Sequence, residues 1–184
     1  MAADDVSEYS RELVTEEHLR RLAAIAREEL DGFFDRNPHL ADYRDAYLLS
    51  ALTQGAALHY ASGGKHRVKD LDVHSFFAKI DPGRHQLRRA RQVRDFGRSV
   101  HGVHPLDVPE GYRGRHVDLY VPLVKGATAG DDPVTAVRGY LRGATTTTAW
   151  HLSQKAVVVI DPPELLGEVI WHNRSAELDP GWDE

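Results

Sequence analysis

The sequence QGAALHY at positions 54–60, followed by KDLDV at positions 69–73, sets the expected fold of this chain. It places a turn of small residues before an apolar strand that carries Asp70 and Asp72. Because side chains alternate along a strand with period two, both aspartates project from the same face. The later sequence RHVDLYV, at positions 115–121, is also typical of a strand and carries Asp118.

Three carboxylates meet at one place if Asp118 lies on the strand beside Asp70 and Asp72. Like charges a few ångströms apart repel strongly outside bulk water, so such a cluster requires cations. Aspartate is also a poor strand former, which argues against chance placement of two in one strand. The pattern therefore predicts a divalent-metal site for phosphoryl or nucleotidyl transfer. The alternative is that both aspartates are solvent-facing residues of an amphipathic strand.

The composition is that of a globular protein of one domain. The chain has 184 residues, of which 41% are apolar and 28% charged. It has no cysteine, which excludes disulfides and thiolate-bound zinc. No apolar run approaches the roughly 18 residues that span a bilayer, and the start of the chain is acidic rather than signal-like. We therefore expect a cytoplasmic protein that does not interact with membranes.

Positive charge is concentrated in one segment. The net charge is −5, yet positions 79–99 hold seven Lys or Arg and only two Asp. A basic segment near a carboxylate cluster indicates an anionic substrate. The predicted phosphate or nucleic-acid contacts are Arg88, Arg89 and Arg94; the alternative is a solvated helix face.

The order of expected elements predicts the α+β class. Helices are expected from Thr15 to Asn37, over 42–52, from Pro133, and over 147–160. Strands are expected over 68–77 and 116–124, whereas 84–93 fits either a helix or an extended segment and 157–160 fits a strand equally well. We predict a single domain, 1–184, with a core at 15–124, a small mixed sheet with flanking helices, and a C-terminal helical part at 133–172.

The motif resembles the signature of the nucleotidyltransferase superfamily typified by DNA polymerase beta. Gly55-Ala56, a spacer of thirteen residues and the strand 70–73 follow the order of that signature, with Asp118 as the third acid. The resemblance covers about residues 45–124. It is greatest to small bacterial stand-alone nucleotidyltransferases, some with toxin–antitoxin or antibiotic-modifying roles. Gly63-Gly64 is a poorer match to the first motif, because only five residues separate it from Asp70.

The resemblance implies metal-binding roles for the three acids. Asp70 and Asp72 would bind two Mg²⁺ ions, for which Mn²⁺ is an expected substitute. Asp118 would share one of these metals and help to deprotonate the attacking hydroxyl.

The resemblance also implies how the nucleotide is held. Gly55 and Ala56 would lie at a helix N-terminus whose backbone N–H groups bind the phosphates. Ala56 stands where the superfamily usually has serine, so one hydroxyl contact is missing. Lys155, in an expected helix after the third acid, would contribute a cation to the triphosphate. The alternative for Lys155 is a side chain that extends to water.

His74 follows the acidic motif and by alternation faces the same side as the acids. A substrate or proton-transfer role is one interpretation, and a hydrogen-bonded histidine is the other. The eleven histidines lack the spacing of a helical zinc motif.

The expected activity is magnesium-dependent transfer of an NMP from an NTP, such as ATP, to a hydroxyl on RNA, a protein or a small molecule. An alternative is a catalytically silent nucleotide- or RNA-binding protein on the same fold. A third is a toxin regulated by a cognate protein partner.

Overall fold

A seven-stranded mixed sheet organises residues 13–80, 87–98 and 114–173, the parts of the chain described by the computed structural model. The strand order is β3-β4-β2-β1-β6-β7, and the short β5 pairs with the end of β2. Strands β2 and β4 are parallel, whereas β1 is antiparallel to both of its neighbours. The strands are β1 (Tyr47–Thr53), β2 (Leu71–Ala78), β3 (Gln92–Arg98), β4 (Gly114–Tyr120), β5 (Leu123–Val124), β6 (Ala156–Asp161) and β7 (Val169–His172).

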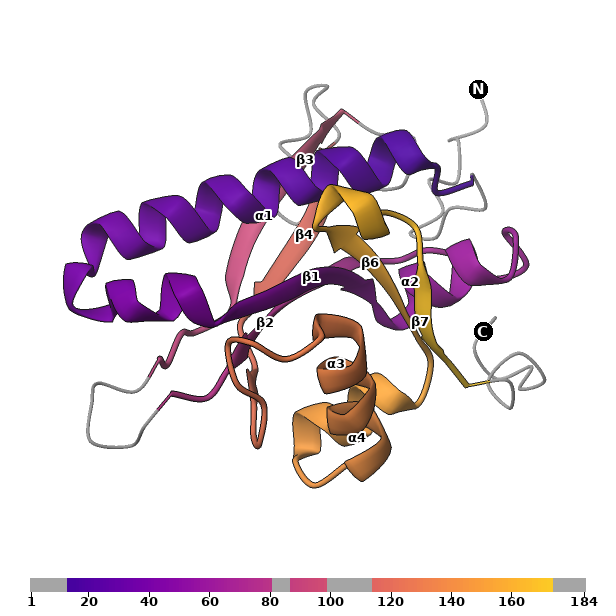
Figure 1. The fold of residues 1–184 in the computed structure, drawn as a ribbon. Helices are drawn as coiled ribbons and strands as arrows, with labels where there is room; N and C mark the ends of the chain where they lie inside the picture. The colour runs from indigo at the N-terminus through magenta and orange to yellow at the C-terminus, as the bar shows by residue number, and fades with distance from the viewer. Residues whose placement is uncertain (1–12, 81–86, 99–113, 174–184) are drawn as a thin grey trace, which may run out of the picture.

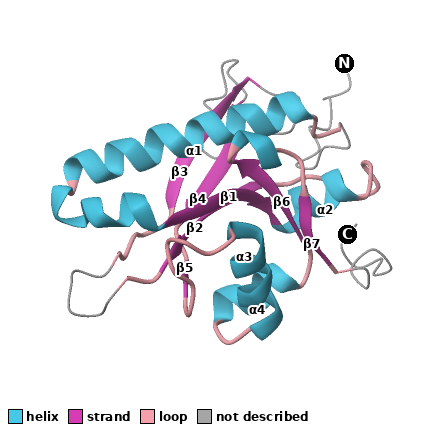
Figure 2. Ribbon diagram, in the orientation of Figure 1, coloured by secondary structure: helices cyan, strands magenta, loops and turns pink. Residues whose placement is uncertain are grey.

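Helices cover both faces of the sheet, with the long α1 on one face and α3 and α4 on the other (Figure 1). Figure 2 shows the same layers coloured by secondary structure. The helices are α1 (Glu16–Arg36), α2 (Gln54–Ala61), α3 (Pro133–Gly143) and α4 (Thr147–Ser153), with the 3₁₀ helices η1 (Pro38–Ala46) and η2 (Pro163–Leu165). The prediction of the α+β class with a mixed sheet is confirmed.

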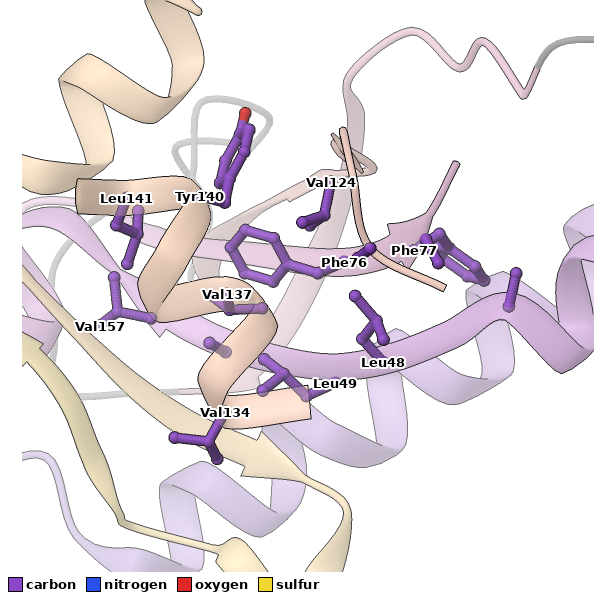
Figure 3. Packing of buried hydrophobic residues seen from close by; sticks show 14 of the residues in the cluster. Leu48, Leu49, Phe76, Phe77, Val124, Val134, Val137, Tyr140, Leu141 and Val157 are labelled. Carbon is purple, nitrogen blue, oxygen red and sulfur yellow. The ribbon is translucent and has the colours of Figure 1, made fainter. Parts of the chain in front are cut away.

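The two layers of apolar side chains follow the alternation of the strands. On the α1 side, Leu71 and Val73 of β2 pack with Val117 and Leu119 of β4. On the α3 side, Phe76 lies among residues of α3, β1 and β5, as Figure 3 shows. Residues of β2 and β4 at the alternate positions therefore face the α3 side, and Asp72 and Asp118 are among them.

The predictions for α1 and α3 are confirmed. Helix α1 begins after Thr15, whose backbone N–H donates to Nδ1 of His18 at 3.1 Å, and it ends before Asn37. Helix α3 begins at Pro133, and the carboxylate of Asp132 accepts a hydrogen bond from Thr135 N at 2.8 Å. At the N-terminus of each of these two helices, a side chain thus accepts a hydrogen bond from a backbone N–H group that has no partner within the helix.

Two predicted helices are wrong in whole or in part. The helix expected over 42–52 is η1 followed by β1, and the helix expected over 147–160 ends at Ser153, so that 156–161 forms β6. Both strands are central and buried on both faces, and six of the seven β1 residues are buried. Such strands read as continuous apolar runs without period-two alternation, which a helix pattern also fits. The alternative interpretation of 157–160 as a strand is confirmed, so 133–172 is not wholly helical.

The remaining elements are of the type that the sequence predicts. Strand β2 lies where a strand was expected, and the expected strand 116–124 is divided into β4 and β5. The basic segment has no regular secondary structure over 87–91 and continues as β3 from Gln92. Positions 81–86, which include the first part of the basic segment, and positions 99–113 lie outside the described residues. Within the described ranges, no helix has the length and apolar character required to cross a membrane.

Candidate functional site

Asp72 and Asp118 occupy paired positions on the parallel strands β2 and β4. Neighbouring strands lie about 4.8 Å apart, so the carboxylates are neighbours on one face. Burial, then the charge of Asp118, then that of Asp70 raise the pKa of Asp72 to about 7. The structure therefore brings Asp72 and Asp118 together, whereas Asp70 lies just before β2 and does not complete a group of three metal ligands in the described residues.

The Asp118 carboxylate is buried and already has two partners. Its Oδ1 accepts a hydrogen bond from Arg91 Nε at 2.6 Å and lies 2.7 Å from Nε2 of His116. The hydrogen bond to Asp118 is the main reason why the pKa of Arg91 is raised. Sequence reasoning did not select Arg91, because its contact with Asp118 follows from the pairing of Val93 with Asp118, which no sequence pattern shows.

Gly55 and Lys155 lie close together beside Asp72. Gly55 is in the first turn of α2, as the resemblance implies, and a Cβ added to it would lie 3.9 Å from Nζ of Lys155. Burial lowers the pKa of Lys155, and the charge of Asp72 opposes that shift. Lys155 lies in the turn before β6 rather than in a helix. The Ala56 side chain is buried in the α1 layer.

The junction between β1 and α2 has an unusual backbone. Gln54, directly before Gly55, has φ = 59°, in the left-handed region that residues other than glycine rarely adopt. Its backbone also forms an isolated antiparallel bridge with Ala156 at the start of β6. This bridge ties the Gly55 turn to the segment that carries Lys155. Strain of this kind is frequent at ligand-binding sites.

His74 is buried on the same face of the sheet as the acids, two residues after Asp72 in β2. Its Nδ1 lies 3.0 Å from the Thr53 hydroxyl, which donates at 3.1 Å to the backbone carbonyl of Asp72. Since a hydroxyl has one hydrogen, both contacts are satisfied when His74 Nδ1 carries the proton. The ring stacks on Tyr120 with centroids 4.6 Å apart. Burial lowers the pKa of His74 to about 3, so the ring is neutral at physiological pH.

The arginines predicted to contact phosphate lie elsewhere. Arg89 and Arg94 form ion pairs with the buried Glu29 of α1, and the Arg89 guanidinium also lies 4.8 Å from the Phe33 ring. Because Arg94 pairs with Val117, it faces the α1 layer, opposite to Asp118. Arg88 is exposed. The structure therefore does not bring Arg89 and Arg94 together with the acids.

The side chains at this site could bind a magnesium ion through two carboxylates, those of Asp72 and Asp118. In the described parts of the chain, no group of three or more His, Asp or Glu side chains is arranged to hold a metal. None of these described residues donates a hydrogen bond to the partly buried Asp72 carboxylate, whose ionised form is disfavoured. Magnesium is commonly bound by one or two carboxylates together with substrate phosphates. Asp72 and Asp118 match that arrangement.

A separate pocket of about 210 Å³ opens at the other end of β1. In it the Asp161 carboxylate accepts hydrogen bonds from Arg27 and, at 2.6 Å, from the Tyr47 hydroxyl. Both oxygens of the buried Asp161 are thus paired, one of them with the half-exposed Arg27, which is the arrangement of a structural carboxylate. Asp161 therefore serves as a comparison for Asp72, whose carboxylate accepts no hydrogen bond from the described residues.

Comparison with known proteins found no match to this chain. No protein-family model matches the chain. Neither the curated proteins nor the solved structures include a match to it.

Proposed function

We propose that this chain is a magnesium-dependent nucleotidyltransferase that moves an NMP from an NTP to a hydroxyl acceptor. The observation that carries the proposal is the pairing of Asp72 with Asp118 beside Gly55 and Lys155. The elements β1, turn, α2, β2 and β4 also follow one another in the order that the nucleotidyltransferase resemblance implies.

Each residue has a role that its surroundings favour. The backbone of the Gly55 turn and the Lys155 ammonium group would bind and orient the triphosphate. Asp72 and Asp118, with Asp70 alongside, would hold Mg²⁺, which when bound neutralises charge on the attacking and leaving oxygens. The two contacts to Asp118 both use Oδ1, so Oδ2 is the oxygen that would accept the proton of the acceptor hydroxyl.

The test is a transfer assay with each α-labelled NTP, Mg²⁺ or Mn²⁺, and total RNA or protein lysate as acceptors. We expect label on one acceptor class with the wild-type protein and none with Asp72→Asn or Asp118→Asn. Asp161→Asn is the control, because it removes a buried carboxylate at the other end of the sheet. Label that persists in Asp72→Asn, or loss of transfer in Asp161→Asn protein that is shown to be folded, would contradict the proposal.

One observation favours a second function, that of a nucleotide-binding protein without turnover. Asp118 is already paired with Arg91 and His116, and Ala56 provides no hydroxyl. A binder that relies on Lys155 should keep or improve its affinity for NTP when Asp72 is replaced by Asn. Nucleotide affinity that rises in this variant, together with no label on any acceptor for the wild type, would favour the binding protein. A cognate protein partner that covers the site, as in toxin–antitoxin pairs, would be a further form of either function.

A further inference from the structure

Arg91 covers the acid pair from the side opposite to Lys155. Its side chain is 49% exposed, whereas the Asp118 side chain that it contacts is 9% exposed. Its Nη2 also lies 3.3 Å from Nε2 of His116. Arg91 comes just before β3, in the segment 87–91 that has no regular secondary structure. Its side chain can therefore rotate toward solvent without breaking a strand.

Lys155 and Arg91 partly neutralise the negative charge of the two acids. Lys155 interacts electrostatically with Asp72, and Arg91 forms its ion pair with Asp118. A divalent cation at Asp72 and Asp118 would lie within a few ångströms of the Arg91 guanidinium. The Arg91 guanidinium, which is attracted to the Asp118 carboxylate, would then also be repelled by the metal ion. In a partly buried site this repulsion is only weakly screened. Metal binding and the Arg91–Asp118 ion pair therefore compete.

A guanidinium released from Asp118 has a suitable new partner close by. Arginine binds phosphate through two parallel N–H donors, and its charge is permanent. The triphosphate expected at Gly55 and Lys155 would lie beside the same acids. Resting on the proposed function, we infer that Arg91 is an exchangeable counter-ion: it occupies Asp118 before the metal binds and contacts the phosphates of the bound nucleotide afterwards.

This inference predicts two affinity changes of opposite sign for Arg91→Gln. Metal affinity without nucleotide rises, because the competing cation is gone. Nucleotide affinity in the presence of metal falls, because a phosphate contact is lost. A charge-assisted hydrogen bond is commonly worth enough to make each change about tenfold. A residue with a purely structural role would not move the two affinities in opposite directions.

The experiment measures Mn²⁺ binding by electron paramagnetic resonance, and then binding of a non-hydrolysable ATP analogue in saturating Mn²⁺ by calorimetry. Arg88→Gln is the matched control, since it removes one positive charge from the same segment at an exposed position. Arg91→Lys is a second variant, which keeps the charge but loses the two parallel donors. We expect Arg91→Lys to have near wild-type Mn²⁺ affinity and weakened analogue binding.

Equal Mn²⁺ affinities for Arg91→Gln and Arg88→Gln would overturn the inference, as would unchanged analogue binding in Arg91→Gln. In either case the proposed function would stand if the wild type binds both ligands. A wild-type protein that binds neither Mn²⁺ nor the analogue would overturn the proposed function and the inference together.

Discussion

The Thr53 hydroxyl, 3.0 Å from Nδ1 of His74, joins the end of β1 to β2 beside Asp72. The same hydroxyl donates to the carbonyl of Asp72. One side chain thus fixes the strand that enters the Gly55 turn relative to the strand that presents Asp72. A polar residue and a neutral histidine are buried here because each satisfies the other.

The buried His74 should make the protein sensitive to acid. Its pKa is lowered to about 3 from about 6.5 in an unfolded chain, so its contribution is present above pH 6.5 and is lost as the pH falls. Between pH 6.5 and 5 the wild type should lose about 2 kcal/mol of unfolding free energy relative to His74→Asn. Urea unfolding of both proteins at pH 7.5 and 5 measures this difference. Equal losses in the two proteins would contradict it.

Asp72 should act in the opposite direction. Its pKa is raised to about 7, so its contribution is present below the unfolded value of about 3.9 and is lost as the pH rises through 7. In EDTA at pH 8, Asp72→Asn should therefore be more stable than the wild type, by about 2 kcal/mol after allowance for solvent screening. Asp161→Asn should be less stable, because it leaves Arg27 without its carboxylate. Thermal unfolding of the three proteins checks both signs.

Gly55→Ala should increase the stability of the protein but weaken its binding of ATP. A Cβ at Gly55 meets only Lys155 Nζ, at an ordinary 3.9 Å, so the helix should gain about 0.5–1 kcal/mol. The added methyl group would however block the approach of phosphate to the backbone N–H groups. Gly139→Ala in α3 is the control, since nothing lies within 4 Å of its added Cβ. Calorimetric titration with ATP should show weaker binding for the first variant only; equal affinities would contradict the phosphate site.

Lys155→Met should weaken nucleotide binding without unfolding the protein. Methionine keeps most of the apolar volume of the lysine stem, and burial disfavours the charge that is removed. Loss of one cation from the phosphates should raise the apparent Kd for ATP about tenfold. Lys65→Met, at an exposed position, is the control. The role of Lys155 is refuted if both variants bind ATP as tightly as the wild type.

Local patterns were sufficient for elements that carry their own signals. Helix α1 has its cap at Thr15 and an apolar stripe, and α3 has Asp132 and Pro133 at its start. Strands β1 and β6 lack such signals, because they are covered on both faces and their apolar runs also fit a buried helix. Their assignment depends on the sheet that forms around them, which no short window of sequence contains.

The same distinction applies to the site. Alternation and chain order were enough to predict that Asp72 and Asp118 share a face. Arg91 was missed because its contact with Asp118 arises from the antiparallel pairing of β3 with β4. Arg89 and Arg94 were assigned to phosphate because their partner, Glu29, is far away in the sequence on α1.

Strand β1 lies between β2, which follows soon after it in the chain, and β6, which comes from the last part of the described chain. During synthesis, therefore, the edge of β1 that pairs with β6 stays unpaired until β6 has left the ribosome. An apolar strand with unpaired backbone groups readily joins other chains. Products that stop before Ala156 should consequently aggregate rather than accumulate as folded fragments, and the sheet should close late, with a rate limited by this long-range pairing.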